Sequence, residues 1–201
     1  MYIRRVNEND YKVLRLLGDC GHVATSTLLW CGISASRIQH LRRTGLICSH
    51  MYLEKSGQKS LKQAWTTTGE GRRFIKDYCR ITPVNTPGAV RHGLALSAEY
   101  AVLVNSRGIK LADIYNELDV KKLIKQKVET YRNNSETYRL LADYNNNPKG
   151  YYRMPDLTFR AQTGELVCIE VVTKTYSDSK RESKARTADF LGAEYIEIDI
   201  H

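Results

Sequence analysis

A nearly continuous apolar segment with a carboxylate at its centre constrains the fold of this chain more than any other feature. Residues 166–172 read Leu-Val-Cys-Ile-Glu-Val-Val, which is the pattern of a strand covered on both faces. Glu170 lies in the middle of this segment. A charge buried there without a partner is strongly unfavourable, so Glu170 requires a cation, a metal ion or a proton.

A second carboxylate is predicted to lie opposite Glu170. A three-residue hairpin loop at 162–164, with Gly164 in the left-handed conformation, would pair Ala161 with Glu165. Counting back along the two strands places Asp156 directly across from Glu170. A two-residue loop would shift this register by one residue and separate the two carboxylates.

The charged residues around this pair predict a divalent-cation site. We expect Asp156 and Glu170 to bind Mg²⁺, with Glu99 helping from a preceding helix and Lys174 stabilising charge from the same strand face. These four residues form the catalytic set if the domain is an active enzyme. The alternative is a buried ion pair, in which Glu170 and either Lys174 or Arg153 hold the sheet together.

The positive charge of the chain is concentrated in its first part. Residues 1–80 contain 14 Lys/Arg and 6 Asp/Glu, a net charge of +8, whereas residues 81–201 contain 17 and 16, a net charge of +1. A basic excess confined to one segment is typical of a surface that binds a polyanion. No apolar segment approaches the length of a membrane span, and we expect a cytoplasmic protein that does not contact membranes.

The first 80 residues predict helix, helix, helix, hairpin and helix. Asn7 or Asn9 is expected to cap a first helix that ends at Gly18, and Thr25 or Ser26 opens a short second helix. The third helix is expected from Ser34 to Thr44. A two-stranded wing with its tip at 54–60 follows, and Thr67 or Thr68 then caps a fourth helix.

The third helix has the pattern of a DNA-recognition helix. Ile38 and Leu41 mark its core side, and hydrogen-bonding and cationic side chains occupy the rest of its surface. Arg43 could bind guanine and Gln39 adenine, each through two hydrogen bonds. Lysines of the wing would contact phosphates. The predicted DNA-binding residues are Ser36, Arg37, Gln39, His40, Arg42, Arg43, Lys55, Lys59 and Lys62.

Five cysteines at irregular spacing argue against a disulfide framework. Two Cys-x-His pairs, Cys20/His22 and Cys48/His50, could in principle form a four-ligand zinc site. Their spacing lacks the short knuckles of zinc modules. We therefore expect buried thiols beside surface histidines.

The remaining sequence predicts a second domain. We expect a linker at 81–90 and a domain over 91–201 that begins with an apolar helix at 90–105 and continues with a helical region at 110–144. Strands near 151–160 and at 165–174, a basic helix near 178–191 and a last strand at 194–200 follow. The predicted fold class is therefore α+β or α/β, with a mixed sheet flanked by helices in this domain.

The two halves resemble known families. Residues 1–80 resemble the winged helix-turn-helix of bacterial regulators, through Gly45-Leu46-Ile47 and Trp65-Thr66-Thr67-Thr68-Gly69. Residues 88–201 resemble the PD-(D/E)xK nuclease-like (restriction-endonuclease-like) superfamily, and within it the replication-relaxation family of plasmid and mobile-element proteins. That resemblance rests on Arg91-His92-Gly93-Leu94, Met154-Pro155-Asp156-Leu157, Glu170 with Thr173, and Lys184.

One departure from the nuclease pattern bears on activity. Val172 stands where the superfamily has its lysine; Lys174, or Lys180 or Lys184 from the next helix, could replace it. The alternative is an inactive domain retained as a DNA-binding or dimerising scaffold, in which the two carboxylates could still bind metal with weak or no cleavage. Of the two, we expect the protein that does not catalyse.

The resemblance implies a sequence-specific double-stranded DNA-binding protein of a phage or plasmid that acts in replication, mobilisation or transcriptional control. A second copy of the chain and relaxase or replication proteins are the further partners it allows. The alternatives are a Mg²⁺-dependent DNA endonuclease using Asp156, Glu170 and Lys174, and an antitoxin-type transcriptional repressor.

Overall fold

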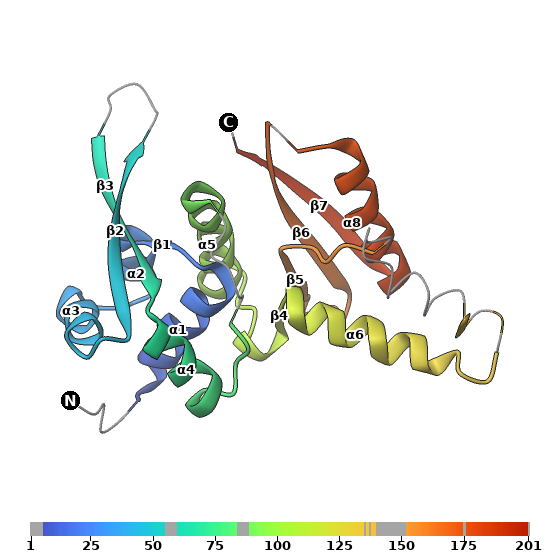
Figure 1. The fold of residues 1–201 in the computed structure, drawn as a ribbon, viewed down its shortest axis with the longest axis horizontal. Helices are drawn as coiled ribbons and strands as arrows, with labels where there is room; N and C mark the ends of the chain where they lie inside the picture. Colours follow the sequence, from blue (N-terminus) through green and yellow to red (C-terminus); the bar gives the residue numbers. More distant parts are fainter. Residues whose placement is uncertain are drawn as a thin grey trace. The chain divides into compact units, whose positions relative to one another are not determined.

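The chain divides into two units, Met1–Gly108 and Ile109–His201, each with helices and one sheet, so the protein is mixed α+β (Figure 1). The computed structural model describes residues 6–54, 60–83, 89–134, 136, 138–139, 152–174 and 176–200. Throughout this described part, each helix is too short or too polar to span a lipid bilayer.

Short polar side chains determine where the helices of the amino-terminal unit begin. Helix α1 (Glu8–Cys20) starts at Asn7, which forms a reciprocal capping box with Asp10. It does not end at Gly18 as predicted: Gly18 is buried inside the helix, and Gly21, with φ +76°, ends it. Helices α2 (Thr25–Trp30), α3 (Ala35–Arg43) and α4 (Gly69–Tyr78) follow; Ser34 caps α3 and Thr68 caps α4, as predicted.

The predicted hairpin forms the larger part of the first sheet. Strands β2 (Ile47–Glu54) and β3 (Ser60–Thr67) pair in antiparallel register, with Leu53 opposite Leu61. Strand β1 (Val23–Ala24), which the sequence analysis did not predict, pairs with the other edge of β3 and gives the order β1-β3-β2. Tip residues 55–59, including Lys55 and Lys59, lie outside the described residues.

Helix α5 (Val90–Asn105) belongs to the amino-terminal unit and not to the second domain in which we expected it. The Tyr100 hydroxyl donates to Asp19 of α1 at 3.3 Å, and the Asn105 amide donates to the carbonyl of Trp30 at 3.3 Å. A Cβ added at Gly93 would come within 2.7 Å of the Cys20 carbonyl oxygen, so α5 packs closely on the turn after α1. The units therefore divide after Gly108, not at 81–90.

The carboxy-terminal unit is a mixed four-stranded sheet with helices. A short turn, η1 (Leu111–Asp113), leads into β4 (Ile114–Asn116), and α6 (Glu117–Thr130) follows. The sheet order is β4-β5-β6-β7, with β5 (Leu157–Arg160), β6 (Leu166–Thr173) and β7 (Ala193–Ile200). Strands β4, β5 and β6 are antiparallel neighbours, whereas β6 and β7 are parallel and joined through α8 (Asp178–Leu191).

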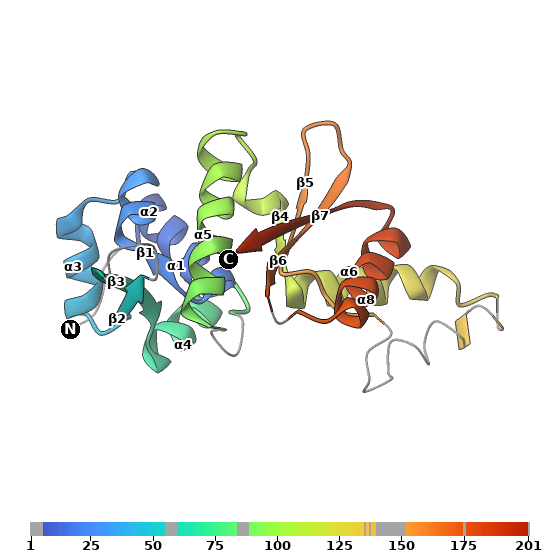
Figure 2. The same ribbon diagram turned by 90° about the horizontal axis from the view of Figure 1, so that it is seen from above.

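Helices α6 and α8 lie on the same side of this sheet (Figure 2). Val120, Ile124 and Val128 of α6 form a buried cluster against which Phe190 at the end of α8 packs. The Lys127 ammonium also donates to the Phe190 carbonyl at 2.5 Å. The helical region predicted at 110–144 is thus partly wrong, because its first residues form η1 and β4, while 135, 137 and 140–151 lie outside the description.

Candidate functional site

The predicted hairpin register brings Asp156 and Glu170 together. The Ala161 amide donates to the Glu165 carbonyl at 2.8 Å, and Gly164 has φ +92°. Leu157 pairs with Ile169, so the next residue pair along the same ladder is Asp156 and Glu170. The three-residue loop inferred from the sequence therefore forms, and it places Asp156 opposite Glu170 as predicted.

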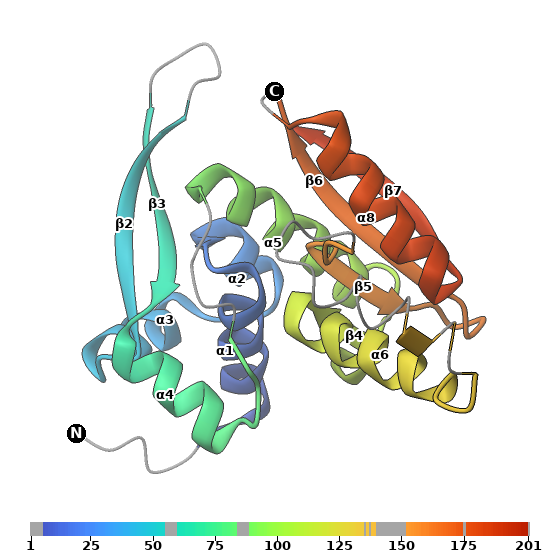
Figure 3. The same ribbon diagram turned by 45° about the vertical axis from the view of Figure 1, so that its right-hand side comes forward.

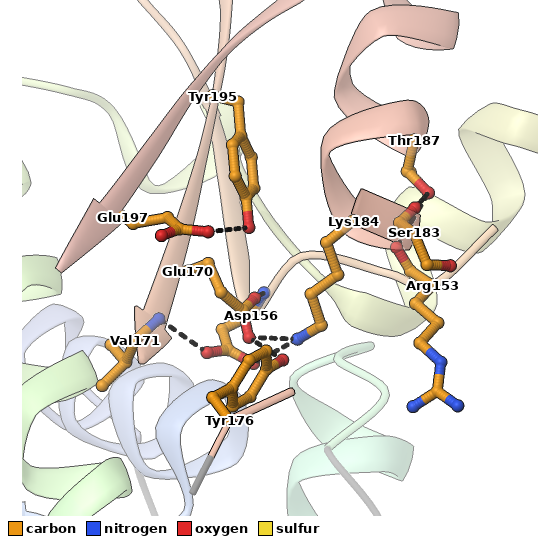
Figure 4. A network of polar contacts seen from close by, with 10 residues as sticks. All are labelled: Arg153, Asp156, Glu170, Val171, Tyr176, Ser183, Lys184, Thr187, Tyr195 and Glu197. Carbon is orange, nitrogen blue, oxygen red and sulfur yellow. Dashed lines mark hydrogen bonds and ion pairs between the residues drawn. The ribbon is translucent and has the colours of Figure 1, made fainter. Parts of the chain in front are cut away.

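Lys184 of α8 binds both carboxylates (Figure 4). Its Nζ lies 2.5 Å from Glu170 Oε1 and 3.1 Å from Asp156 Oδ1. Backbone amides complete the arrangement: Asp156 N donates to Glu170 Oε2 at 3.1 Å, and Val171 N donates to Asp156 Oδ2 at 2.9 Å. The Tyr176 hydroxyl also donates to Glu170 Oε1, so each of the four carboxylate oxygens accepts a hydrogen bond from the protein.

Burial controls the protonation of this cluster. It raises the pKa of Glu170 to about 7, with a further rise from the Asp156 charge, and Lys184 only partly opposes both effects. Burial alone would lower the pKa of Lys184, but the charges of Asp156 and Glu170 outweigh it, and the pKa lies above its usual value. Burial also raises the pKa of Tyr176 to about 12. Glu170 therefore holds a proton more tightly than an ordinary glutamate, even though the Lys184 ammonium lies beside it.

Lys174, the predicted charge-stabilising residue, is exposed, and the cation on the carboxylates comes from Lys184 instead. Arg153, the other predicted partner of Glu170, is also exposed. The sequence carried a signal for Lys184. Ser183, Thr187 and Ala188 mark α8 with small side chains at helical spacing, and Lys184 shares that buried face.

A second ion pair, which the sequence analysis did not predict, continues the polar row across the sheet. Glu197 of β7 is the register partner of Glu170 on β6. Arg181, one helical turn before Lys184, donates to Glu197 at 2.6 Å, and the Tyr195 hydroxyl donates to the same carboxylate at 3.1 Å. Asp156 just before β5, Glu170 on β6 and Glu197 on β7 thus bind two cations of α8, Arg181 and Lys184, which are three residues apart on that helix.

An ammonium group lies between the two carboxylates of this cluster. Lys184 takes one oxygen of Asp156 and one of Glu170, and protein donors occupy the other two. Among the residues described, no three His, Cys, Asp or Glu side chains are arranged to hold a metal ion. Glu99, the predicted helper, lies on α5 in the other unit.

The surface of α3 is the second candidate site. Ile38 and Leu41 are buried, as the helical pattern predicted. The polar residues of the predicted recognition surface divide by exposure: His40 and Arg37 are half-buried, whereas the exposed ones are Ser36, Gln39, Arg42 and Arg43.

Arg37 has a structural partner that the sequence analysis missed. Its Nε and Nη2 donate to the two carboxylate oxygens of Asp10, a fully buried residue of α1. This hydrogen bonding raises the pKa of Arg37. Arg37 therefore fastens α3 to α1, and the free face of α3 depends on Arg42 and Arg43 for its positive charge.

The charge of the amino-terminal unit is larger than the sequence boundaries suggested. With α5 included, Met1–Gly108 contains 16 Lys/Arg and 7 Asp/Glu, a net charge of +9, while Ile109–His201 contains 15 of each and is neutral. Three of the seven acidic side chains, Glu8, Asp10 and Asp19, are paired with cations inside the unit. Lys62, the described lysine of the predicted wing contacts, is exposed on β3.

The two Cys-x-His pairs do not form a zinc site in the part of the chain that the structure describes. The His22 and His50 rings lie 6.0 Å apart, and Cys48 Sγ lies 3.8 Å from His50 Nε2. His22 is buried and not at the surface as expected. Burial lowers its pKa, and His50 adds to the effect, so His22 is a neutral core residue.

No protein-family model, curated protein or solved structure matches this chain.

Proposed function

We propose that the chain is a sequence-specific double-stranded DNA-binding protein whose amino-terminal unit is a winged helix-turn-helix. The order α1-β1-α2-α3-β2-β3, with sheet order β1-β3-β2, supports this assignment. The observation that carries the proposal is the exposed Gln39, Arg42 and Arg43 face of α3, in a unit that holds the whole net charge of the protein. A basic, polar helix surface of this kind fits the major groove of DNA.

Different side chains would read the DNA bases and bind the DNA phosphates. Gln39 and Arg43 have the donors and acceptors to read adenine and guanine edges, and Arg42 is suited to a phosphate at the rim of the groove. Asp10 and Arg37 fix the position of α3 against α1, so the reading side chains approach the bases from a rigid support. Lys62 adds a phosphate contact from the hairpin.

The carboxy-terminal unit acts in this proposal as a non-catalytic domain of PD-(D/E)xK nuclease type. Its order of elements supports that assignment, with Asp156 just before β5, Glu170 on the adjacent strand β6 and Lys184 on the following helix. The donors on all four carboxylate oxygens favour a structural cluster over a cutting site. Such a protein would act in the replication, mobilisation or transcription of a mobile element.

Selection from a random duplex library with the full chain tests the proposal. Repeated rounds of binding and amplification should enrich one motif, and Arg43→Ala should relax the preference at a guanine position by about 1–3 kcal/mol. A library that stays random with wild-type protein would contradict sequence-specific binding. Protection of the chain's own promoter in footprinting would favour the repressor alternative.

A Mg²⁺-dependent DNA endonuclease is the second candidate, and the meeting of Asp156, Glu170 and a lysine in one buried cluster favours it. Supercoiled plasmid incubated with the full chain and Mg²⁺ or Mn²⁺ tests this activity. Nicking that disappears in Asp156→Asn, Glu170→Gln and Lys184→Met, but persists in Lys174→Met, would establish it. If the plasmid stays intact under all conditions, the endonuclease candidate fails and DNA binding remains the proposed function.

A further inference from the structure

An apolar stripe runs along one face of the β2–β3 hairpin. It consists of Met51, Leu53 and Leu61, whose exposed fractions are 57%, 58% and 61%. Leu53 and Leu61 are register partners, and Met51 lies two residues from Leu53, so the three side chains share a face. Figures 1 and 3 show that the hairpin extends well past α1, α3 and α4 of its unit.

The stripe lies on the same face of the sheet as residues of the hydrophobic core. Ile47 and Trp65 occupy the same face nearer the base of the hairpin, and both are buried. The Trp65 indole nitrogen donates to Thr25 at the start of α2 at 2.9 Å, which places α2 on this side. The stripe therefore faces the side of the sheet on which α2 lies, the helix that directly precedes the proposed DNA-reading helix α3.

A second copy of the chain is a poor occupant for this stripe. Three side chains supply far less area than the roughly 800 Å² per partner of a standard stable interface. Each amino-terminal unit carries +9, so two hairpins brought face to face would repel each other. Duplex DNA, a polyanion with stacked bases inside, suits both the positive charge of the unit and the apolar stripe of the hairpin.

We propose that Leu53 and Leu61, supported by Met51, insert as a wedge into the minor groove of the bound DNA and partly unstack one base step. This inference rests on the proposed DNA-binding function and adds a second element to it. Leucine and methionine are among the side chains that unstack base steps and kink the duplex towards the major groove, by roughly 20–90°. Pyrimidine–purine steps unstack most easily, so the hairpin would favour them without reading a base edge.

The test is a bending measurement on the full chain bound to its selected duplex, labelled at both ends for energy transfer. Wild-type protein should shorten the end-to-end distance. Leu53→Ser with Leu61→Ser should leave the bound duplex straight and weaken binding about 10- to 100-fold. The salt dependence of binding should stay the same, because no phosphate contact is lost.

Leu29→Ser is the matched control, since Leu29 is an exposed leucine of α2, 48% exposed, outside the hairpin. It should leave both bending and affinity unchanged, and both variants should unfold at the wild-type temperature because the substituted side chains are exposed. A straight duplex under wild-type protein, or bending that survives in the double variant, would overturn the wedge alone. Absence of binding to any duplex would overturn the proposed function together with the wedge. A double variant that dissociates a wild-type dimer but still bends DNA would assign the stripe to self-association instead.

Discussion

Lys184 on α8 and Glu170 on β6 form a buried ion pair, with 2.5 Å between Nζ and Oε1. Asp156 joins the same ammonium at 3.1 Å, and Glu170 itself is fully buried. The pair fastens the crossover helix to the centre of the sheet. The cation of this pair therefore comes from the helix and not from the strand that carries Glu170.

Removing the ammonium should destabilise the carboxy-terminal unit. Lys184→Met leaves two adjacent buried carboxylates without their cation, a loss of about 3–5 kcal/mol in the free energy of unfolding. Lys174→Met, at an exposed position ten residues earlier, should change it by less than about 0.5 kcal/mol. Urea unfolding of both variants measures the difference. Equal stabilities would mean that Lys184 does not compensate the carboxylates.

The stability of the protein should depend on pH through Glu170. Its pKa is about 7 in the folded protein against about 4.5 when unfolded, so the folded state holds the proton more tightly. The stabilisation from this proton is complete below about pH 4.5 and is lost as the pH rises through about 7. Wild-type stability should therefore fall relative to Glu170→Gln between pH 5 and pH 8. Glu165→Gln, at an exposed position, serves as the control; a wild-type curve parallel to that of Glu170→Gln would refute the shift.

Substitutions of two arginines of α3 should affect different properties, one the stability of the protein and the other its DNA binding. Arg37→Met leaves the buried Asp10 carboxylate unpaired and should lower the free energy of unfolding by about 3–5 kcal/mol. Arg42→Met, at an exposed position, should leave stability unchanged and weaken DNA binding. Thermal unfolding and DNA titration of both variants give the comparison. The ion pair would lose its structural role if Asp10→Asn with Arg37→Met were no more stable than Arg37→Met alone.

Two glycines of α4 test the packing of the amino-terminal unit. A Cβ added at Gly71 would lie 1.9 Å from the Leu46 carbonyl oxygen, whereas a Cβ at Gly69 meets nothing within 4 Å. Gly71→Ala should therefore cost about 1–3 kcal/mol or more through forced backbone movement. Gly69→Ala should be neutral or slightly stabilising. Similar unfolding midpoints for the two variants would contradict the close approach of α4 to Leu46.

Local patterns predicted much of the fold. The caps at Asn7, Ser34 and Thr68 and the loop at Gly164 each depend on residues next to one another in sequence, and each forms as expected. The register of Asp156 against Glu170 followed from that loop alone. Helix α8 was predicted at 178–191 and spans Asp178–Leu191.

Apart from two local errors, the helix end at Gly18 and the helix expected from residue 110, the errors concern partners far apart in sequence. Nothing near Arg37 indicates Asp10, 27 residues earlier, and nothing near Glu197 indicates Arg181. The assignment of α5 failed because an apolar helix after a Pro-containing linker resembles the start of a new domain. Its packing on Asp19 and the Cys20 turn becomes apparent only in three dimensions.

Fluorescence anisotropy of the full chain with its selected duplex, over a range of salt concentrations, measures the proposed binding of DNA by α3. Arg42→Ala with Arg43→Ala should weaken binding at least about 10-fold and make the salt slope shallower by about one unit per lost phosphate contact. Arg73→Ala, an exposed arginine of α4, should retain selective binding. No change in anisotropy with any duplex at low ionic strength, or a double variant that binds like wild type, would contradict DNA binding by α3.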